Sequence, residues 1–338
     1  MSNFAKVRSE LQELSPRPAV RAISVAVLIP CHNEAATIAQ VVEGFRTALP
    51  GATVYVYDNN STDRTAELAA AAGAVVRRET RQGKGYVVRK MFADIDADVY
   101  VLTDGDLTYD ASAAGQLVDT LLADDLDMVV GVRLGGGEGA YRPGHALGNR
   151  MFNLMVAGLF GEGFTDILSG YRALSRRFVK AFPGASTGFE IETELSIHAL
   201  DLQLGVAELG LAYGVRPQDS QSKLRTYRDG ARILTAIVLI YKRLKPLQFL
   251  GGIGLFLVAL GFVLGAPVIL TFLRTGFVPR LPTAVLAAAL CQIGFLSLGC
   301  GVILDGISQT RREMKRMRYL ELGPPSDGTA FKRPNSAL

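Results

Sequence analysis

Over the first two thirds of the chain, short apolar runs alternate with segments in which apolar residues recur at helical spacing. Short apolar runs predict strands at residues 24–29, 53–57, 74–77, 99–103 and 128–132. Between them, apolar residues recur at helical spacings and predict helices at residues 34–47, 63–72, 84–95 and 111–122. Because strands and helices alternate, residues 24–224 are expected to fold as an α/β domain with a largely parallel sheet.

The last third of the chain contains two long stretches without charge. No charged residue lies between Lys245 and Arg274, and none lies between Arg280 and Asp305. Each stretch exceeds the ~20 apolar residues that span a bilayer. A short link joins them, so we predict a hairpin of two transmembrane helices. Two buried core helices of a soluble protein are the alternative, and the length of the stretches disfavours them.

Basic residues flank these stretches unequally. The connecting link carries only Arg274 and Arg280, whereas both outer flanks are strongly basic. The flanking basic residues are Arg225, Arg228, Arg232, Lys242, Arg243 and Lys245 before the first stretch, and Arg311, Arg312, Lys315, Arg316 and Arg318 after the second. Because cytoplasmic flanks are enriched in Lys and Arg, we predict that the N-terminal domain and both termini are cytoplasmic.

An amphipathic pattern covers residues 227–244, between the domain and the first apolar stretch. Its apolar residues fall at helical spacings and its ends are basic, as expected for a helix in the lipid headgroup layer. The alternative is an ordinary amphipathic helix packed on the domain. The predicted division is residues 1–22, a globular domain at 23–225, an interfacial helix at 226–246, two spans within 247–310 and a basic tail at 311–338.

Composition adds two expectations. The chain has 338 residues, 49% of them hydrophobic, and a formal net charge of +4. Of the three cysteines, Cys31 follows the first predicted strand, and Cys291 and Cys300 lie in the second span, so we expect no disulfide framework. The first twenty residues are charged and lack an apolar core, so we expect no signal peptide.

Three polar clusters follow predicted strands, at residues 30–34, 58–63 and 103–106. Ligands of parallel sheets bind beyond the carboxyl ends of the strands, where these clusters are expected to lie. Structural roles are also available, because Asn33, Ser61 and Asp63 are candidate helix N-caps.

Capping does not explain why four carboxylates should meet at one rim. Glu34, Asp58, Asp104 and Asp106 repel one another unless a cation or the hydrogen-bond donors of a ligand compensate. Asp104-Gly105-Asp106 alone is a weak signal, because Asp-Gly is also common in turns. With its acidic neighbours it predicts a site for Mg²⁺ or Mn²⁺, which bind carboxylates and leave positions for a diphosphate.

Two glycine-rich segments resemble nucleotide-binding loops only in part. Residues 82–85 lack the upstream glycine and the following Ser or Thr of a phosphate loop, so we predict a tight turn with Lys84 available to a ligand. Residues 135–139 lack the spacing of a dinucleotide fingerprint. We predict that residues 135–144 form a flexible loop at the site.

Other polar residues have structural explanations. His145 and His198 lack ligand-like spacing to another His or Cys, so we interpret them as structural residues. Glu190 and Glu192 open a predicted helix, where acidic side chains complement the helix dipole. The same two carboxylates are also candidates for contacts to ligand hydroxyls.

In order and spacing, residues 29–34, 58–65, 104–106 and 166–172 resemble the motifs of family 2 glycosyltransferases with the Rossmann-like GT-A fold. The closer resemblance, over residues 23–225, is to polyprenyl-phosphate glycosyltransferases such as dolichol-phosphate mannose synthases. The two-span tail is similar to the bactoprenol glucosyltransferases. This resemblance implies hexose transfer from a nucleotide sugar to undecaprenyl phosphate at the bacterial inner membrane, dependent on Mg²⁺ or Mn²⁺, with no nucleic-acid partner.

The resemblance also implies roles for individual residues. Asp104 and Asp106 match the metal ligands, and Asp166 matches the residue assigned as the catalytic base. The implied donor-binding residues are Pro30, His32, Glu34, Asp58, Asn60, Lys84, Asp104, Gly105, Asp106 and Arg133. The implied acceptor-binding residues are Ser169, Arg172, Arg176, Lys223 and Arg225.

Three positions depart from the family pattern. His32 replaces a tyrosine, Asn59-Asn60 replaces Asp-Gly, and Thr108 stands where some relatives have a glutamine metal ligand. These departures leave open the third metal contact and the base of the donor nucleotide. The sugar also stays open, because one or two hydrogen bonds separate the common hexoses.

The acceptor's chemistry modifies the role expected of Asp166. A phosphate monoester has a second pKa near ~6 and is largely dianionic at neutral pH, so it hardly needs a base. We therefore hypothesise that Asp166 orients acceptor-binding cations as much as it abstracts a proton. A single displacement would invert the sugar, with Arg133 and the metal stabilising the leaving diphosphate.

Two other functions stay open. A processive polysaccharide synthase normally carries a Gln-x-x-Arg-Trp motif, and this chain has no tryptophan. A membrane-anchored nucleotide-sugar-binding protein without activity is the second alternative.

Gly261 and Gly265 in the first span are candidates for helix packing, and hence for a homo-oligomer, a dimer or tetramer.

Overall fold

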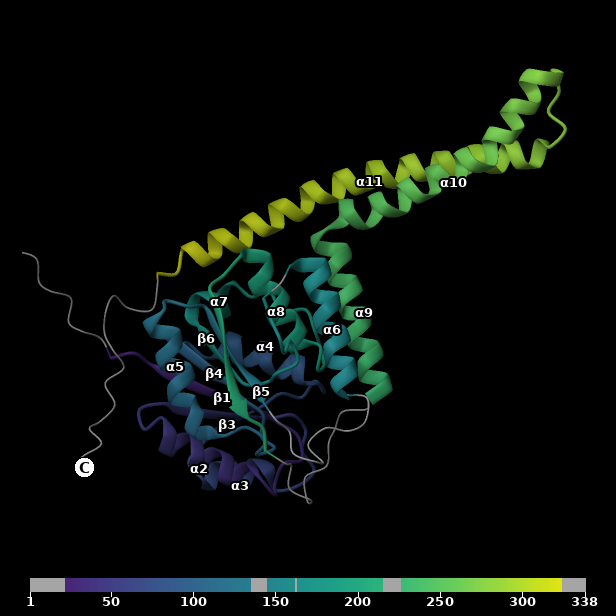
Figure 1. The fold of residues 1–338 in the computed structure, drawn as a ribbon. Helices are drawn as coiled ribbons and strands as arrows, with labels where there is room; N and C mark the ends of the chain where they lie inside the picture. Colours follow the sequence, from purple (N-terminus) through teal and green to yellow (C-terminus); the bar gives the residue numbers. More distant parts are fainter. Residues whose placement is uncertain (1–21, 135–144, 162, 215–225, 324–338) are drawn as a thin grey trace, which may run out of the picture.

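The computed structural model describes residues 22–134, 145–161, 163–214 and 226–323. Lys223, Arg225 and the glycine-rich segment 135–144 lie outside these ranges, so the roles predicted for them stay predictions. The described residues form an α/β domain, from which a long helical hairpin projects (Figure 1).

A seven-stranded sheet forms the centre of the described domain, in the order β3-β2-β1-β4-β6-β5-β7. The strands are β1 Val25–Cys31, β2 Thr53–Asp58, β3 Val75–Arg78, β4 Val99–Leu102, β5 Met128–Leu134, β6 Arg172–Ser175 and β7 Val206–Ala212. All neighbouring strands are parallel except β6, which is antiparallel to both β4 and β5. The five predicted strands are confirmed, whereas β6 and β7 were not predicted.

Helices cover both faces of the sheet. The helices of the domain are α2 Ile38–Ala48, α3 Thr65–Ala71, α4 Lys84–Asp94, α5 Ala114–Ala123, α6 His145–Phe160, α7 Arg176–Ala181 and α8 Ile191–Leu202, with a short 3₁₀ turn η1 at Ala111–Ala113. Along β1, Val27 and Ile29 pack toward α2, α3 and α5, whereas Ala26 and Leu28 pack toward α4, α7 and α8. Burial on both faces explains the continuous apolar runs of the strands.

Asn33 and Ser61 are not the N-cap residues of the first two helices, whereas Asp63 Oδ1 accepts a hydrogen bond from the Thr65 N–H at 3.0 Å, at the start of α3. The N-cap residues of α2 and α3 are Thr37 and Arg64, and neither side chain makes a capping hydrogen bond. Asn33 and Ser61 instead join the loops after β1 and β2. The Asn33 side chain accepts from the Thr62 N–H at 2.7 Å, and Ser61 Oγ accepts from the Asn33 N–H at 2.9 Å. These bonds hold two loops of the polar rim together.

The hairpin consists of α10 (Pro246–Thr275) and α11 (Leu281–Leu320). Both helices are long and apolar enough to cross a membrane, and only 22% and 17% of their most apolar stretches are buried. Core helices of a soluble protein would be mostly buried, so the exposed apolar surface favours the membrane interpretation.

Small residues bring α10 and α11 together. A Cβ atom on Gly254 would lie 2.7 Å from the Gly294 carbonyl oxygen, and one on Gly261 would lie 2.6 Å from Cys291 Sγ. Gly261 therefore packs inside the hairpin of a single chain. Gly265 also faces α11, near Ala287. The helix packing predicted for these two glycines is therefore confirmed within one chain, while the homo-oligomer stays a prediction.

The second hairpin helix continues far beyond its apolar part. Its last turns pack on α7 and α8 (Figure 1). Arg312 and Lys315 pair with Asp201 of α8, whose side chain is 2% exposed. The boundary predicted at residue 310 therefore lies within a continuous helix, and part of the predicted basic tail binds the domain.

The amphipathic helix is confirmed as α9, Thr226–Leu244. It runs beside α6, and its Ile233 and Ile237 are buried with Phe152 and Val156 of that helix (Figure 1). Its other side exposes Leu234, Val238 and Leu239. One face thus packs on the domain, while the opposite face leaves apolar side chains uncovered.

Candidate active site

The polar rim lies at the carboxyl ends of β1, β2 and β4. The register places Cys31 beside Asp58, and Leu102 beside Leu28, so the segments that follow these strands meet at one edge. Glu34, Asp58 and Asp106 are each less than 9% exposed there. The predicted convergence of acidic residues is therefore present, and it places several carboxylates in poorly solvated positions.

Close packing explains the glycine between the two aspartates. A Cβ atom on Gly105 would lie 2.7 Å from Cys31 Sγ and 3.6 Å from Glu34 Cγ. The Gly105 carbonyl also accepts a hydrogen bond from Thr37 Oγ1 at 2.6 Å. The Asp-Gly-Asp segment is thus pressed against the ends of β1 and α2, which fixes the positions of both carboxylates.

Thr108 supports Asp106. Its N–H and hydroxyl donate to Asp106 Oδ1 at 3.2 and 2.6 Å, and the threonine is 3% exposed. Within the described residues no group of three or more His, Cys, Asp or Glu side chains could hold a metal. Two carboxylates suit a Mg²⁺ or Mn²⁺ ion that takes its remaining ligands from phosphates and water. The donor set present therefore fits such an ion.

Lys84 at the start of α4 contacts two carboxylates. Its ammonium pairs with Asp104 and with Glu192 of α8, and the lysine side chain is 10% exposed. Burial lowers the pKa of Lys84, but the charges of Asp104 and Glu192 outweigh burial and raise it above its ordinary value. Lys84 is therefore a permanent positive charge beside the predicted metal ligands.

Asn59 fixes the loop that leads to Lys84. Its side-chain amide donates to the carbonyls of Glu79 and Arg81 at 2.9 and 2.8 Å, and its oxygen accepts from the Gly83 N–H at 2.7 Å. Sequence reasoning noted Asn59 only as a departure from the family pattern. Its role depends on residues twenty or more positions away, which the local sequence does not reveal.

His32, Asn60 and Pro30, three more of the predicted donor-binding residues, lie in or beside neighbouring loops. His32 Nδ1 lies 2.8 Å from the Asn59 carbonyl oxygen. Asn60 adopts φ 58° and its side chain donates to the Thr80 carbonyl at 2.7 Å. Asparagine tolerates this left-handed backbone better than most residues, so it substitutes structurally for the glycine of the family pattern. Pro30 lies next to Tyr57 in the paired strands.

Arg133 and Asp166 form a two-pronged ion pair near the end of β5. Arg133 Nε and Nη2 lie 2.7 and 2.6 Å from the two oxygens of Asp166. The side chains are 15% and 4% exposed, and the guanidinium lies over the ring of Tyr213. Asp166 thus holds an arginine in a defined orientation, as bidentate pairs do.

Ser169 and Arg172 are scaffold residues in the structure. Both are fully buried. Ser169 Oγ donates to the Gly131 carbonyl, while the Arg172 guanidinium donates to the carbonyls of Ile167 and Ser169. Burial lowers the pKa of Arg172 to about 10, so it stays charged at neutral pH. In this structure the two side chains shape the loop that carries Asp166, and the acceptor contacts implied for them stay predictions.

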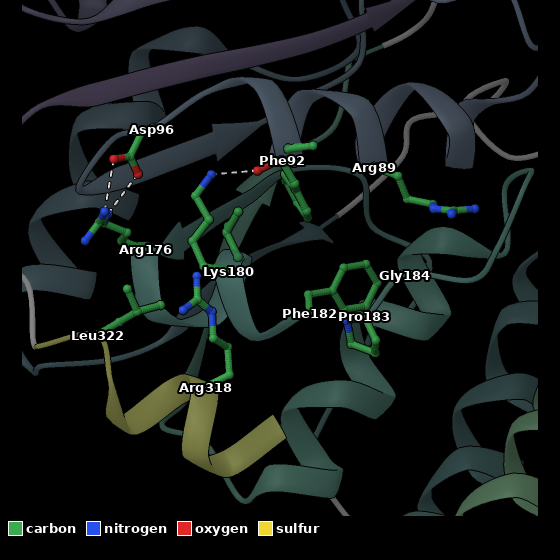
Figure 2. A pocket seen from close by; sticks show the side chains of 12 residues that line it. Arg89, Phe92, Asp96, Arg176, Lys180, Phe182, Pro183, Gly184, Arg318 and Leu322 are labelled. Carbon is green, nitrogen blue, oxygen red and sulfur yellow. Dashed lines mark hydrogen bonds and ion pairs between the residues drawn. The ribbon is translucent and has the colours of Figure 1, made fainter. Parts of the chain in front are cut away.

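Arg176 lies at the opposite edge of the sheet. Ser175 pairs with Val99 at the start of β4, whereas Asp104 follows the other end of that strand. Arg176 pairs with Asp96 beside an open cavity of about 530 Å³ (Figure 2). This placement corrects the prediction that Arg176 binds the acceptor, because the arginine does not reach the polar rim.

Two tyrosines line the rim without having been predicted. Tyr109 accepts a hydrogen bond from the Gly170 N–H at 2.9 Å and packs edge-on against Tyr213, with ring centroids 5.4 Å apart. Burial raises the pKa of Tyr109, so it stays neutral. A Cβ atom on Gly170 would lie 2.6 Å from Asp104 Oδ2. Lone tyrosines in a sequence usually indicate core packing, so no local signal marked them.

The chain is similar to known glycosyltransferases. Residues 26–182 match the family model described as Glycosyl transferase family 2. The glycosyltransferase AglJ of Haloferax volcanii is 35% identical over 88% of this chain and 98% of its own length. A dolichyl-phosphate hexose transferase of the same organism is 29% identical over 63% of this chain and 92% of its own length.

A solved structure has the same fold. The glucosyl-3-phosphoglycerate synthase of Mycobacterium tuberculosis, crystallised with Mn²⁺ and UDP-glucose, superimposes with a TM-score of 0.52 and 26% identity. The match covers 65% of this chain and 79% of that one. With a GT-A-like domain and a relative similar over nearly its full length, the chain belongs to glycosyl transferase family 2 and is a glycosyltransferase.

Proposed function

We propose that this enzyme transfers a hexose from a nucleotide sugar to a polyprenyl phosphate, such as undecaprenyl phosphate, at the cytoplasmic face of a bacterial inner membrane. The observation that carries the proposal is the joining of two features in one chain. A rim of acidic residues with Lys84 and Arg133 lies on a family 2 domain, and an apolar hairpin is attached to it.

Relatives support both substrates. Two are named for dolichyl or dolichol phosphate: the hexose transferase from Haloferax volcanii and a mannosyltransferase from Pyrococcus furiosus, which is 26% identical over 66% of this chain. The synthase of similar fold was crystallised with UDP-glucose. We infer a nucleotide diphosphate sugar as donor and a lipid phosphate as acceptor.

Asp104 and Asp106 are the proposed ligands of a Mg²⁺ or Mn²⁺ ion. Such an ion, when bound, would neutralise negative charge on the donor diphosphate. Gly105 and Thr108 hold the two carboxylates in place, while Lys84 adds a positive charge on the same side. Glu34 and Asp58 are proposed to accept hydrogen bonds from the nucleoside of the donor.

Arg133 and Asp166 are proposed to act together. Asp166 fixes the guanidinium of Arg133 through two hydrogen bonds, so that arginine can stabilise a phosphate oxygen as charge develops on the leaving group. The acceptor phosphate is already largely dianionic at neutral pH. Its oxygen attacks the anomeric carbon in one displacement, which inverts the sugar and releases the nucleoside diphosphate.

Asp166→Asn separates an orienting role from an obligatory base. If Asp166 mainly orients Arg133, the variant should keep measurable transfer at pH 8, because the acceptor phosphate is already ionised. The measurement is the pH dependence of kcat between pH 6 and 9. Transfer at background level across this whole range would contradict the expected retention of activity and would favour an obligatory base.

The proposed membrane arrangement would bring the site near the lipid. The exposed apolar side chains of α9, with Lys242 and Arg243 at its end, suit a helix at the lipid headgroup layer. Figure 1 shows α9 running along the domain at an angle to the hairpin. We propose that α10 and α11 span the bilayer while the domain stays on the cytoplasmic side.

The substrate proposal is tested with membranes that contain the enzyme and a panel of labelled nucleotide sugars. We expect one donor to deliver label to undecaprenyl phosphate, so that it partitions into organic solvent, and we expect EDTA to abolish this transfer. Asp106→Asn membranes are the matched control. Label found only in a polymer would favour a processive synthase, and label that stays aqueous with every donor would favour an inactive binding protein.

A further inference from the structure

Lys84 joins carboxylates from two distant parts of the chain. Asp104 follows β4, and Glu192 lies in the first turn of α8. The ammonium pairs with Asp104 and lies 2.5 Å from Glu192 Oε1. The side chains of Lys84 and Glu192 are only 10% and 5% exposed, whereas that of Asp104 is 28% exposed. Lys84 therefore contacts the buried Glu192 on its inner side and the more exposed Asp104 on the side that faces solvent.

Two glycines explain how the chain builds this arrangement. A Cβ atom on Gly83 would lie 2.1 Å from the Thr187 carbonyl oxygen, and one on Gly85 would lie 2.4 Å from that of Ser186. The segment before α8 thus packs directly against the backbone on both sides of Lys84. A side chain at either glycine would push this segment away and separate Glu192 from the lysine.

The charges of the three groups do not balance. One ammonium between two carboxylates leaves a net charge of about −1 in a poorly solvated place. Among the described residues, Glu192 Oε2 has no hydrogen-bond partner. Lys84 forms the direct ion pair with Glu192, and the buried Arg172 also interacts with it through its charge. The negative charge of Glu192 offsets part of the positive electrostatic potential that Lys84 produces at Asp104.

We propose that Lys84, Asp104 and Glu192 act as one unit that sets the affinity of the enzyme for its divalent cation. Glu192 is a positioning residue in this unit, because it shares the ammonium of Lys84 with Asp104 and is not a proposed metal ligand. This inference rests on the proposed function, in which Asp104 is a metal ligand. Lys84 competes with the cation for Asp104, and Glu192 weakens that competition.

The unit also connects metal binding with donor binding. When the carboxylate of Asp104 is shared with a cation, Lys84 stays anchored by Glu192 and can donate to an oxygen of the donor diphosphate. The cation and the diphosphate would then each favour binding of the other. The enzyme should bind a metal weakly alone and more tightly with a nucleoside diphosphate.

Mn²⁺ titrations of the purified full-length protein, read by electron paramagnetic resonance without a donor, test this unit. Lys84→Met removes the competing charge and should tighten Mn²⁺ binding by about tenfold. Glu192→Gln leaves Lys84 to Asp104 alone and should weaken Mn²⁺ binding by a similar factor. The double variant has the same net charge as the natural unit, so its affinity should return to within about threefold of that of the natural protein.

Controls separate this effect from a loss of structure. Lys90→Met makes the same substitution on the same helix and should leave Mn²⁺ affinity unchanged. Lys84→Met leaves two carboxylates without their counter-ion; if thermal melting shows that it does not fold, Glu192→Gln and the double variant carry the test alone. Weakening in both Lys84→Met and Glu192→Gln, or no recovery in the double variant, would overturn the inference.

The outcome for the natural protein distinguishes the two proposals. Mn²⁺ binding that UDP or GDP tightens supports the metal site, and the variants then decide whether the unit controls it. If the natural protein binds no Mn²⁺ with either nucleotide, the proposed metal site is wrong and the unit loses its basis. If it binds Mn²⁺, but Lys84→Met and Glu192→Gln do not change the Mn²⁺ affinity in opposite directions, only the present inference is wrong.

Discussion

At the scale of single residues, shape constrains this site as strongly as charge. Gly105 and Gly170 carry no side chain, yet each lies where a Cβ atom would displace a neighbour of the rim. Ser169 and Arg172 match motif positions that the family resemblance assigned to the acceptor, but the structure buries them. A motif can therefore mark a functional site by building its walls as well as by supplying contacts.

Gly105→Ala should reduce transfer by about tenfold or more, because its methyl group would collide with Cys31 Sγ and shift the two aspartates. Cys31→Ala removes the colliding sulfur, so the double variant should recover much of the lost activity. The measurement is kcat/KM for the donor in all three variants. Equal losses in Gly105→Ala and in the double variant would contradict the packing explanation.

His198 supplies a prediction about pH. Its ring is buried between Phe178 and Phe182, and burial lowers its pKa to about 3. The unfolded chain protonates this histidine below about pH 6.5. Its stabilising contribution is therefore complete above that pH, and it is lost progressively as the pH falls toward 3.

His198→Phe should flatten the pH dependence of stability. Between pH 7 and pH 5 the natural protein should lose about 2 kcal/mol more unfolding free energy than the variant. Denaturant unfolding of both proteins, purified in the same detergent, gives this difference, because all other titrating groups are shared. Identical pH dependences in the two proteins would show that the histidine is not held neutral.

At the scale of elements, local patterns predicted most of the sheet and both hairpin helices, but they missed the 16-residue helix α6. Strands with continuous apolar runs were found because burial on both faces leaves a local signal. β6 is short and contains the buried Arg172, and β7 contains Glu208 and Gly210, so neither has a clear period. The pairing of Lys84 with Glu192 joins residues far apart in the sequence, which no local pattern encodes.

The docked end of α11 is the element whose role the sequence concealed. Arg312 and Lys315 look like lipid-facing charges, yet they pair with Asp201, and Tyr319 donates to Asp127 at 2.9 Å. Both aspartates are buried in the domain. A single helix thus leads from the apolar hairpin to the domain and restricts how the domain can tilt.

Asp201→Asn should loosen this docked end, because two cations lose a buried partner. We expect destabilisation of about 1–3 kcal/mol and faster hydrogen exchange over residues 312–320, measured by mass spectrometry. Glu321→Gln is the control, since its pair with Arg318 is exposed and should contribute little. Unchanged exchange in Asp201→Asn would indicate that apolar packing alone holds α11.

At the scale of the whole molecule, the chain combines a soluble catalytic fold with an apolar hairpin. This combination suits the proposed pair of substrates, a donor that is soluble in water and an acceptor embedded in lipid. The exposed apolar face of α9 lies between these two parts. Fold and family followed from sequence patterns, whereas the identity of the sugar depends on a few hydrogen bonds that those patterns do not specify.

The most direct test of lipid-phosphate glycosylation is the mass of the product. Purified enzyme in vesicles would receive undecaprenyl phosphate, the active nucleotide sugar and Mg²⁺, and the lipid extract would be analysed by mass spectrometry. We predict one hexose joined to the lipid monophosphate, with one nucleoside diphosphate released for each product. A lipid diphosphate with release of nucleoside monophosphate, or a lipid carrying a growing sugar chain, would contradict this function.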